Sequence, residues 1–248
     1  MKRGDAVVFS ISAVLAVAVV AAVSYSLLVV DRKPSDAEVS GSSVSSLLAL
    51  TWGPSLCKVE PSNSGCRSGH VGQLGQVFIL HGLWPQPSSE QYCGVPQRAA
   101  GRPAVALPQD VQAGLQQMMS DASVMASHEW YAHGTCSGVA APEYFAIATS
   151  LTDQVRKVLD PLFDRAEGRR LAPRSVREAF DSEFGRGAGN RVGLTCRDVN
   201  REGTLVYEVH LSLPPVTDLR NGATTPSLAE ALAKGPTIPA GCGQGRVP

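Results

Sequence analysis

The chain has 248 residues, of which 44% are apolar and 18% are charged, and its formal net charge is zero. That length fits one large domain or two small ones. A chain without net positive charge lacks the broad field by which non-specific nucleic-acid binders attract phosphates, so any nucleic acid would have to be held by local contacts.

The first 33 residues are typical of an export signal. Lys2 and Arg3 precede an apolar run over residues 6–30, which is long enough to span a bilayer. A cleaved signal peptide and an uncleaved transmembrane anchor both remain open. In either case we expect the rest of the chain to be exported, to the periplasm or to the extracellular space.

A flexible linker is predicted between this segment and the folded domain. Residues 34–46 are rich in serine and poor in bulky apolar side chains, a composition that cannot form a packed core. We therefore place the domain at 47–248, with its first strand over 47–52.

The six cysteines are an even number, which in an exported protein favours three disulfides. Six cysteines can pair in fifteen ways. Pairing nearest neighbours gives Cys57–Cys66, Cys93–Cys136 and Cys196–Cys242. The sequence contains no Cys-x-x-Cys spacing, which disfavours a zinc site.

A second strand is predicted over residues 76–80, a short run of apolar residues. It ends at His81, because Gly82 and Pro85 both break strands. The segment from Pro85 to residue 107 carries several prolines and is expected to form a long functional loop.

The remaining elements are four helices and a hairpin. The helices are predicted from Pro108, over 122–134, from Pro142, and from a Ser175–Glu178 capping box to before Gly185. Two β-rich runs, 192–199 and 204–213, form the hairpin, and its alternation places His210 at the surface. Strands and helices without regular alternation predict a single α+β domain.

Two short segments carry three of the five histidines. They are His81-Gly-Leu-Trp-Pro85 and His128-Glu-Trp-Tyr-Ala-His-Gly-Thr-Cys136. On a helix, Glu129 and His133 lie one turn apart on the same face. A Cys93–Cys136 disulfide would hold the loop after the first segment against the second. We therefore expect one acid–base site, since histidine exchanges protons near neutral pH.

The residue spacing disfavours two other chemistries. A zinc metalloprotease requires His-Glu-x-x-His, whereas His128 and His133 are five residues apart, which turns them off a common helix face. No Gly-x-Ser-x-Gly motif of a serine hydrolase occurs. Because no protein nucleophile stands out, we expect the substrate to supply one. RNA does so through its 2′-hydroxyl, with one base and one acid and without a metal.

The two segments, in this order and at this distance, resemble the two active-site signatures of the ribonuclease T2 family of secreted acid endoribonucleases. The resemblance extends from about Leu47 to Cys242. It implies an α+β fold with an antiparallel sheet packed with several helices, RNA as the substrate, and no cofactor. It also implies cleavage of single-stranded RNA through 2′,3′-cyclic phosphates to 3′-phosphates.

The resemblance implies roles for six residues, three of them catalytic and three of them substrate-binding. The catalytic residues are the general base His133, the general acid His81 and Glu129, which stabilises the phosphorane. The substrate-binding residues are His128 at the phosphate and the base-stacking Trp84 and Tyr92.

Two positions depart from the family pattern. Ala132 stands where the family usually has a lysine, so a cation that would steady the phosphorane is missing. Gln86 stands where some members have an acidic residue implicated in base choice, which leaves base preference open. The alternative is a catalytically weakened relative that binds RNA or a protein. We expect a monomer, with anchoring through residues 6–30 as the alternative to full secretion.

Overall fold

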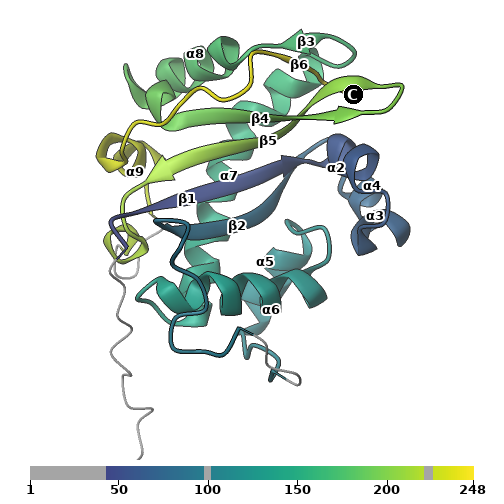
Figure 1. The fold of residues 1–248 in the computed structure, drawn as a ribbon. Helices are drawn as coiled ribbons and strands as arrows, with labels where there is room; N and C mark the ends of the chain where they lie inside the picture. The colour runs from purple at the N-terminus through teal and green to yellow at the C-terminus, as the bar shows by residue number, and fades with distance from the viewer. Residues whose placement is uncertain (1–42, 98–101, 221–225) are drawn as a thin grey trace, which may run out of the picture. The chain divides into compact units, whose positions relative to one another are not determined.

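The computed structural model describes residues 43–97, 102–220 and 226–248 (Figure 1). The predicted export segment, 1–33, and most of the predicted linker lie outside the described residues. Within the described ranges, no helix combines the length and the apolar character needed to cross a membrane.

A mixed sheet of six strands forms the centre of the described fold (Figure 1). Its strands are β1 (Ser45–Trp52), β2 (Phe78–Gln86), β3 (Arg170–Leu171), β4 (Val192–Val199), β5 (Gly203–Leu213) and β6 (Gly245–Arg246). They run in the order β2-β1-β5-β6-β3, and β4 also pairs with β5. All pairs are antiparallel except β5 with β6, which meet in parallel at Leu205 and Arg246. The predicted α+β class is confirmed, with this one short parallel pairing added.

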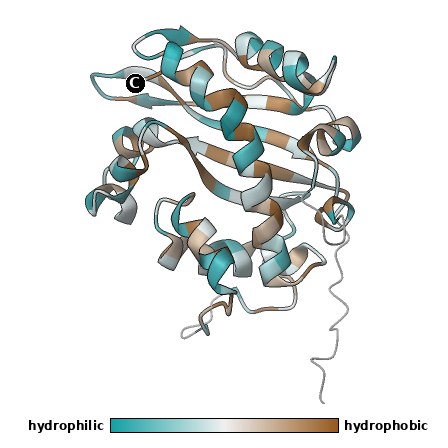
Figure 2. Cartoon of the chain, turned by 180° about the vertical axis from the view of Figure 1, so that it is seen from behind, coloured by the Kyte–Doolittle hydropathy of each residue, from teal (hydrophilic) through white to brown (hydrophobic). Residues whose placement is uncertain are grey.

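Helices cover the sheet and its ends. In the described ranges the α-helices are α2 (Gly53–Val59), α3 (Ser64–Arg67), α4 (His70–Leu74), α5 (Gln109–Gln116), α6 (Ala122–Ala132), α7 (Ala141–Arg165), α8 (Pro173–Phe184) and α9 (Leu228–Lys234). The long α7 crosses the strands on one face, as Figure 2 shows from behind. Its buried residues recur at helical spacing, as predicted from Tyr144 onward. There Phe163 packs with Trp52 and Phe78, with ring centroids 4.6–5.1 Å apart.

The three predicted disulfides are present, and of the fifteen possible pairings the chain has the one between nearest neighbours. Cys57–Cys66 ties α2 to α3, and Cys196–Cys242 ties β4 to the C-terminal segment. Cys93–Cys136 ties the loop that follows β2 to the 3₁₀ turn that follows α6. The loop after His81 is therefore covalently attached beside the end of the second histidine segment.

The first two strands are longer than predicted. β1 begins at Ser45, so two residues assigned to the linker belong to the sheet. β2 continues through Gly82 and Pro85 to Gln86, and the predicted break after His81 is wrong. An edge strand tolerates proline because one of its sides has no strand to bond, and β2 is an edge strand of this sheet.

The predicted starts of α5, α6 and α7 agree with the structure to within about a residue. The predicted capping box of α8 is wrong. This helix begins at Pro173, whose missing N–H costs little at a helix start, and Ser175 lies inside it. Glu178 pairs with Arg174 at 2.7 Å instead of capping the helix.

Candidate active site

A β-bulge sets the position of His81. Ala49 of β1 pairs with Gly82, while the next residue, Leu50, pairs with Leu80, so His81 is the extra residue of β2. A bulge bends the strand locally and changes the direction of the side chain it carries. The strand that was predicted to end here thus continues, and its irregularity falls at the candidate general acid.

Gly82 allows the strand and α6 to approach closely. A Cβ atom at this position would lie 1.9 Å from Oε2 of Glu129 and 2.4 Å from Nε1 of Trp84. No side chain fits there without moving the carboxylate. The glycine of the first histidine segment is therefore required by the packing of Glu129 against the strand.

The second histidine segment is only partly helical. Asp121 caps α6 by accepting from the N–H of Ser123, and the helix ends at Ala132. His133 still donates its N–H to the carbonyl of Glu129 at 3.1 Å, but its own backbone (φ −126°, ψ −49°) is not helical. Glu129 therefore lies on the helix as expected, whereas His133 lies just beyond the helix end and not on its regular face.

Because the helix stops, His128 and His133 lie side by side. Their ring centroids are 6.1 Å apart, so the prediction that a five-residue spacing separates them is wrong. Donor atoms of these two rings and of Glu129 lie within 4.8 Å of one another, a set that a divalent ion could in principle use. The spacing argument against such an ion therefore does not hold in the folded chain.

Trp84 lies at the centre of the histidine cluster. Its ring centroid is 5.0 Å from that of His81, 5.6 Å from that of His133 and 5.8 Å from that of His210. The indole N–H donates to Oε2 of Glu129 at 2.9 Å. The side chain thus keeps the histidines apart and joins β2 to α6.

Glu208 of β5 connects two histidines and was not predicted. Its Oε1 lies 2.7 Å from Nδ1 of His81 and accepts from Oγ1 of Thr51 at 3.0 Å, and its Oε2 lies 3.0 Å from Nε2 of His210. The prediction of His210 as a surface residue is wrong, since it is half-buried in this cluster. One sequence signal was available: Glu208 and His210 are two positions apart in a predicted strand, so their side chains point to the same face of the sheet.

The site separates the pKa values of its histidines. Burial alone would lower the pKa of His81, but the hydrogen bond and charge of Glu208, with Glu129 and Glu60 at longer range, raise it above 6.5. Burial, with the charges of His128 and His81, lowers the pKa of His133 to about 4. One histidine therefore favours its protonated form and the other its neutral form over the same pH range.

The two carboxylates of the site are shifted in opposite directions. Burial raises the pKa of Glu129 to about 7, against the charge of His81 and the hydrogen bond from Trp84. Burial also opposes ionisation of Glu208, but His210 and His81 together lower its pKa to about 2. Glu208 is therefore ionised at all ordinary pH values, whereas Glu129 is protonated in weak acid.

Tyr92 lies beside the end of α6, held there by the Cys93–Cys136 disulfide. Its N–H donates to the carbonyl of Ala132 at 3.0 Å. The guanidinium of Arg102 lies 4.9 Å from the centre of the Tyr92 ring and 5.0 Å from that of Tyr131. The Arg102 guanidinium thus stacks between two aromatic rings. These rings lie next to Ala132, where the family that the chain resembles usually has a lysine.

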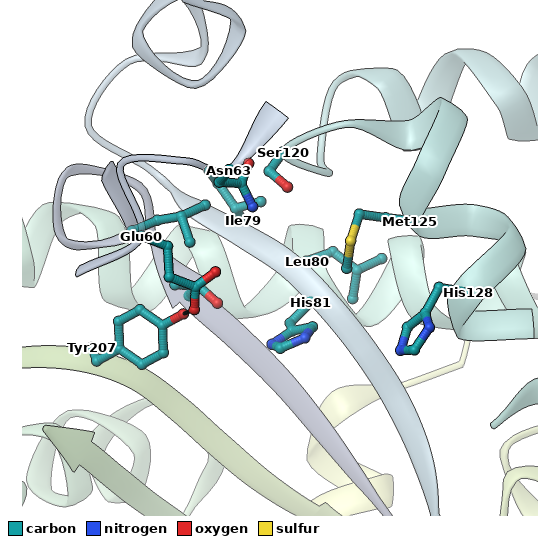
Figure 3. A pocket seen from close by; sticks show the side chains of 11 residues that line it. Glu60, Asn63, Ile79, Leu80, His81, Ser120, Met125, His128 and Tyr207 are labelled. Carbon is teal, nitrogen blue, oxygen red and sulfur yellow. Dashed lines mark hydrogen bonds between the residues drawn. The ribbon is translucent and has the colours of Figure 1, made fainter. Parts of the chain in front are cut away.

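A cavity of about 290 Å³ opens beside the histidines (Figure 3). Figure 3 shows Tyr207 and Glu60 at one end of it and His128 at the other, with His81 between them. The Tyr207 hydroxyl donates to Glu60. The lining residues are Thr51, Leu56, Glu60, Asn63, Ile79, Leu80, His81, Ser120, Met125, His128 and Tyr207. Seven of these eleven residues are polar or ionisable, so the cavity offers many hydrogen-bonding groups beside a smaller apolar wall.

The chain is similar to several known ribonucleases. It is 32% identical over 107 residues to a ribonuclease of Aeromonas hydrophila, a stretch that covers 42% of each chain. It is 27% identical over 160 residues to ribonuclease MC of Momordica charantia, covering 59% of this chain and 75% of that one. The chain thus spans less than half the length of the Aeromonas relative.

Solved structures share the fold. RNase NT superposes with a TM-score of 0.57 at 20% identity, over 83% of this chain and 96% of that one. Ribonuclease MC1 from bitter gourd seeds superposes with a TM-score of 0.52 at 22% identity, over 69% and 90%. The profile described as the Ribonuclease T2 family matches residues 45–224. Because this match covers well over half of the sequence, the chain belongs to the ribonuclease T2 family.

Proposed function

We propose that the protein is an endoribonuclease that cleaves single-stranded RNA by metal-independent transphosphorylation. The observation that carries this proposal is the pairing of His81 and His133 across Trp84. One ring is hydrogen-bonded to a carboxylate and the other is half-buried beside a second histidine. Family membership and the named ribonuclease relatives support the same activity.

The two histidines divide the proton transfers. Neutral His133 accepts the proton of the 2′-hydroxyl as that oxygen attacks the adjacent phosphorus. Protonated His81 donates to the departing 5′-oxygen, which leaves a 2′,3′-cyclic phosphate and a new 5′-hydroxyl. In the second step the roles reverse, and water opens the cyclic ester to a 3′-phosphate. Since Nδ1 of His81 faces Glu208, Nε2 is the atom that serves the substrate.

Glu129 and His128 act on the phosphate. With a pKa of about 7, Glu129 is a neutral acid in the weakly acidic range and can donate a hydrogen bond to a phosphorane oxygen. Its Oε1 is buried, with no hydrogen-bond partner among the described residues and with Nε2 of His128 at 3.9 Å. His128 is exposed and available to a phosphate oxygen. We assign phosphorane stabilisation to Glu129 and phosphate contact to His128.

The cavity beside His81 is proposed to take a base of the RNA, while Trp84 and Tyr92 offer ring faces to its neighbours. Solved complexes of RNase MC1 variants contain 5′-UMP and 5′-GMP, and RNase NT has been solved with 5′-AMP. These nucleotide complexes of similar folds support nucleotide binding in this chain. They do not fix its base preference, because Gln86 departs from the acidic residue of some members.

Arg102 is proposed to compensate for Ala132. Its charge acts on His128, the residue assigned to phosphate contact. Burial lowers the pKa of His128, and the charges of His81 and Arg102 lower it further. It lies beside Tyr131, the neighbour of Ala132, and beside Tyr92, which is bonded to the Ala132 carbonyl. A guanidinium here can offset part of the phosphorane charge. If it does not, the rival function, a weakened relative that binds RNA or protein, gains support.

Cleavage in the presence of a chelator tests the function. The purified protein is incubated with single-stranded RNA and EDTA, and the 3′ ends are analysed for 2′,3′-cyclic phosphate. We expect cyclic ends first and 3′-phosphates later, and a loss of at least about 100-fold in His81→Ala and His133→Ala. His70→Ala is the matched control, because His70 bonds the carbonyl of Gln116 away from the cluster.

Two outcomes would overturn the mechanism. Full activity of His81→Ala or His133→Ala would show that the two histidines do not act as the acid–base pair. Loss of RNA cleavage in EDTA would instead favour a metal-dependent reaction at His128, Glu129 and His133. Export through residues 1–33, and a monomeric state, stay predictions. Sequencing of the mature N-terminus distinguishes a cleaved signal from an anchor.

A further inference from the structure

Glu208 is a buried carboxylate whose two oxygens are both engaged by side chains from three adjacent strands. Thr51 of β1 and His81 of β2 meet Oε1, and His210 of β5 itself meets Oε2. A buried carboxylate is costly unless it is hydrogen-bonded, and only 5% of this residue is exposed. Its partners therefore hold it in one position.

We propose that Glu208 is a positioning residue that orients His81 as the general acid and sets the upper pH limit of the reaction. This inference rests on the proposed function, since it concerns how one of its two histidines is prepared. It assigns to β5 a part in the site that the two histidine segments do not contain.

The first step of the argument is orientation. Oε1 of an ionised carboxylate can only accept, so the proton shared at 2.7 Å with His81 belongs to Nδ1. That contact fixes the tautomer and the ring plane, and Trp84 limits the ring on its other side at a centroid distance of 5.0 Å. With Nδ1 occupied, Nε2 is left to carry and deliver the catalytic proton.

The second step is charge. His81 bulges from β2 among titratable groups of several elements: Glu208 and His210 on β5, Glu129 and His128 on α6, His133 at the end of α6, and Glu60 after α2. Of the carboxylates in the described chain, Glu208 is the one hydrogen-bonded to His81. Its charge stays in place across the working range, whereas Glu129 loses its charge in weak acid. A fixed negative partner keeps His81 protonated to higher pH.

The third step is the role of His210. Its Nε2 lies 3.0 Å from Oε2 of Glu208, and its ring packs against Trp84. It occupies the carboxylate oxygen that His81 does not use. A Glu208 side chain with only one side held could rotate away from the bulge, so His210 completes the support.

Glu208→Gln tests the proposal, because glutamine keeps the shape and an acceptor but removes the charge. The measurement is kcat/KM against pH for a short RNA. We expect the basic limb to move to lower pH by about one to three units, as expected when an opposite charge is lost at contact distance. The rate loss relative to the parent protein is expected to grow with pH and to be smallest in acid, with KM little changed.

The matched control is Asp198→Asn. Asp198 is an exposed carboxylate on the neighbouring β4, bonded to Thr204, and its loss removes the same charge from the same hairpin. Its pH profile is expected to coincide with that of the parent protein. An unchanged basic limb in Glu208→Gln, or a rate loss equal at every pH, would overturn the proposal, since a purely structural carboxylate produces the latter.

A second measurement needs no variant and covers the case in which Glu208→Gln does not fold. Nitrogen-15 NMR of the histidines in the full protein reports the tautomer and pKa of His81. We expect a proton on Nδ1 throughout and a pKa above that of His133. A neutral His81 protonated only on Nε2 contradicts the proposal. Neither NMR result depends on RNA cleavage, so an inactive protein would overturn the proposed function while leaving this inference open to its own test.

Discussion

The indole of Trp84 donates its N–H to Oε2 of Glu129 across 2.9 Å, and this bond joins the strand of the first histidine segment to the helix of the second. The two segments are 45 residues apart at this contact. Glu129 is almost fully buried, so Trp84 supplies one of the few partners this carboxylate has. The relative position of the acid and the base therefore depends on a residue that the family resemblance assigns to base stacking.

Trp84→Phe keeps a ring and removes this bond. An unpaired buried acceptor costs about 1–3 kcal/mol, and the cost is greatest where Glu129 is charged, above its pKa of about 7. We expect a loss of that size in the free energy of unfolding at pH 8 and a smaller loss at pH 5, measured by urea denaturation. Trp130→Phe is the control, since Trp130 packs against Tyr144 and the core. A Trp84→Phe loss of equal size at both pH values contradicts the role of the bond.

Gly82→Ala tests the close approach of β2 and α6. The added methyl would overlap Oε2 of Glu129 at 1.9 Å, so the strand or the carboxylate must shift. We expect a loss of about 1–3 kcal/mol in stability and a large fall in kcat. Gly72→Ala is the matched change, because nothing lies within 4 Å of its Cβ position in α4 and helical alanine is favourable. Stability is measured by calorimetric melting and kcat by RNA cleavage, for both variants. If Gly82→Ala changed neither quantity, β2 and α6 would not be tightly packed at this position.

The sequence predicted the parts of the site that lie in short local patterns. His81, His128, Glu129 and His133 fall in two segments, and Cys93–Cys136, which brings the segments together, is one of several pairings that the sequence allows. Glu208 carries no such pattern, because its bond to His81 spans 127 residues and depends on the order of three strands. A single residue among alternating strand positions does not reveal which face or which neighbour it will meet.

Strand irregularities account for most of the remaining differences. Gly82 and Pro85 predict a strand end, whereas the edge strand continues through both, with a bulge at His81. On β5 a second register shift, between Thr195 and Cys196 of the paired strand, leaves Tyr207 out of the alternation. This shift places the buried Tyr207 in the cavity wall and in a small apolar cluster with Leu56, separate from the core cluster that contains Val209. Bulges depend on pairing geometry and therefore stay hidden until the partners are known.

Arg102→Ala tests the compensation for Ala132. We expect kcat to fall by about tenfold, less than the roughly 100- to 1,000-fold that a direct contact with the developing oxyanion contributes, because Arg102 acts only through its charge. Ala132→Lys in the Arg102→Ala background is expected to restore part of the rate. Ala132 is buried, so this double variant is first checked for folding by circular dichroism.

Ala132→Lys alone distinguishes the two functions. A gain below about threefold is expected if Arg102 already supplies the charge. A gain of 100-fold or more would show that the native site is impaired and would favour the weakened relative. Rates are compared at low and high salt, because salt screens a charge that only attracts RNA over a distance more than a partly buried charge that contacts the phosphate.

The pH profile of the parent protein tests the division of labour between the two histidines. The base His133 must be neutral, and burial lowers its pKa to about 4, so the rate is expected to rise with pH up to about pH 4.5. The acid His81 must be protonated, and Glu208 holds its pKa above the ordinary histidine value against the effect of burial, so the fall in rate is expected at higher pH than for an ordinary histidine. Ionisation of Glu129 near pH 7 adds to the same fall. We expect a plateau in weak acid between two limbs that belong to the coupled cluster rather than to single residues. The measurement is kcat/KM from pH 3 to 9 at constant ionic strength, and a rate that still rises between pH 5 and 7 would falsify the assignment of His133 as the base.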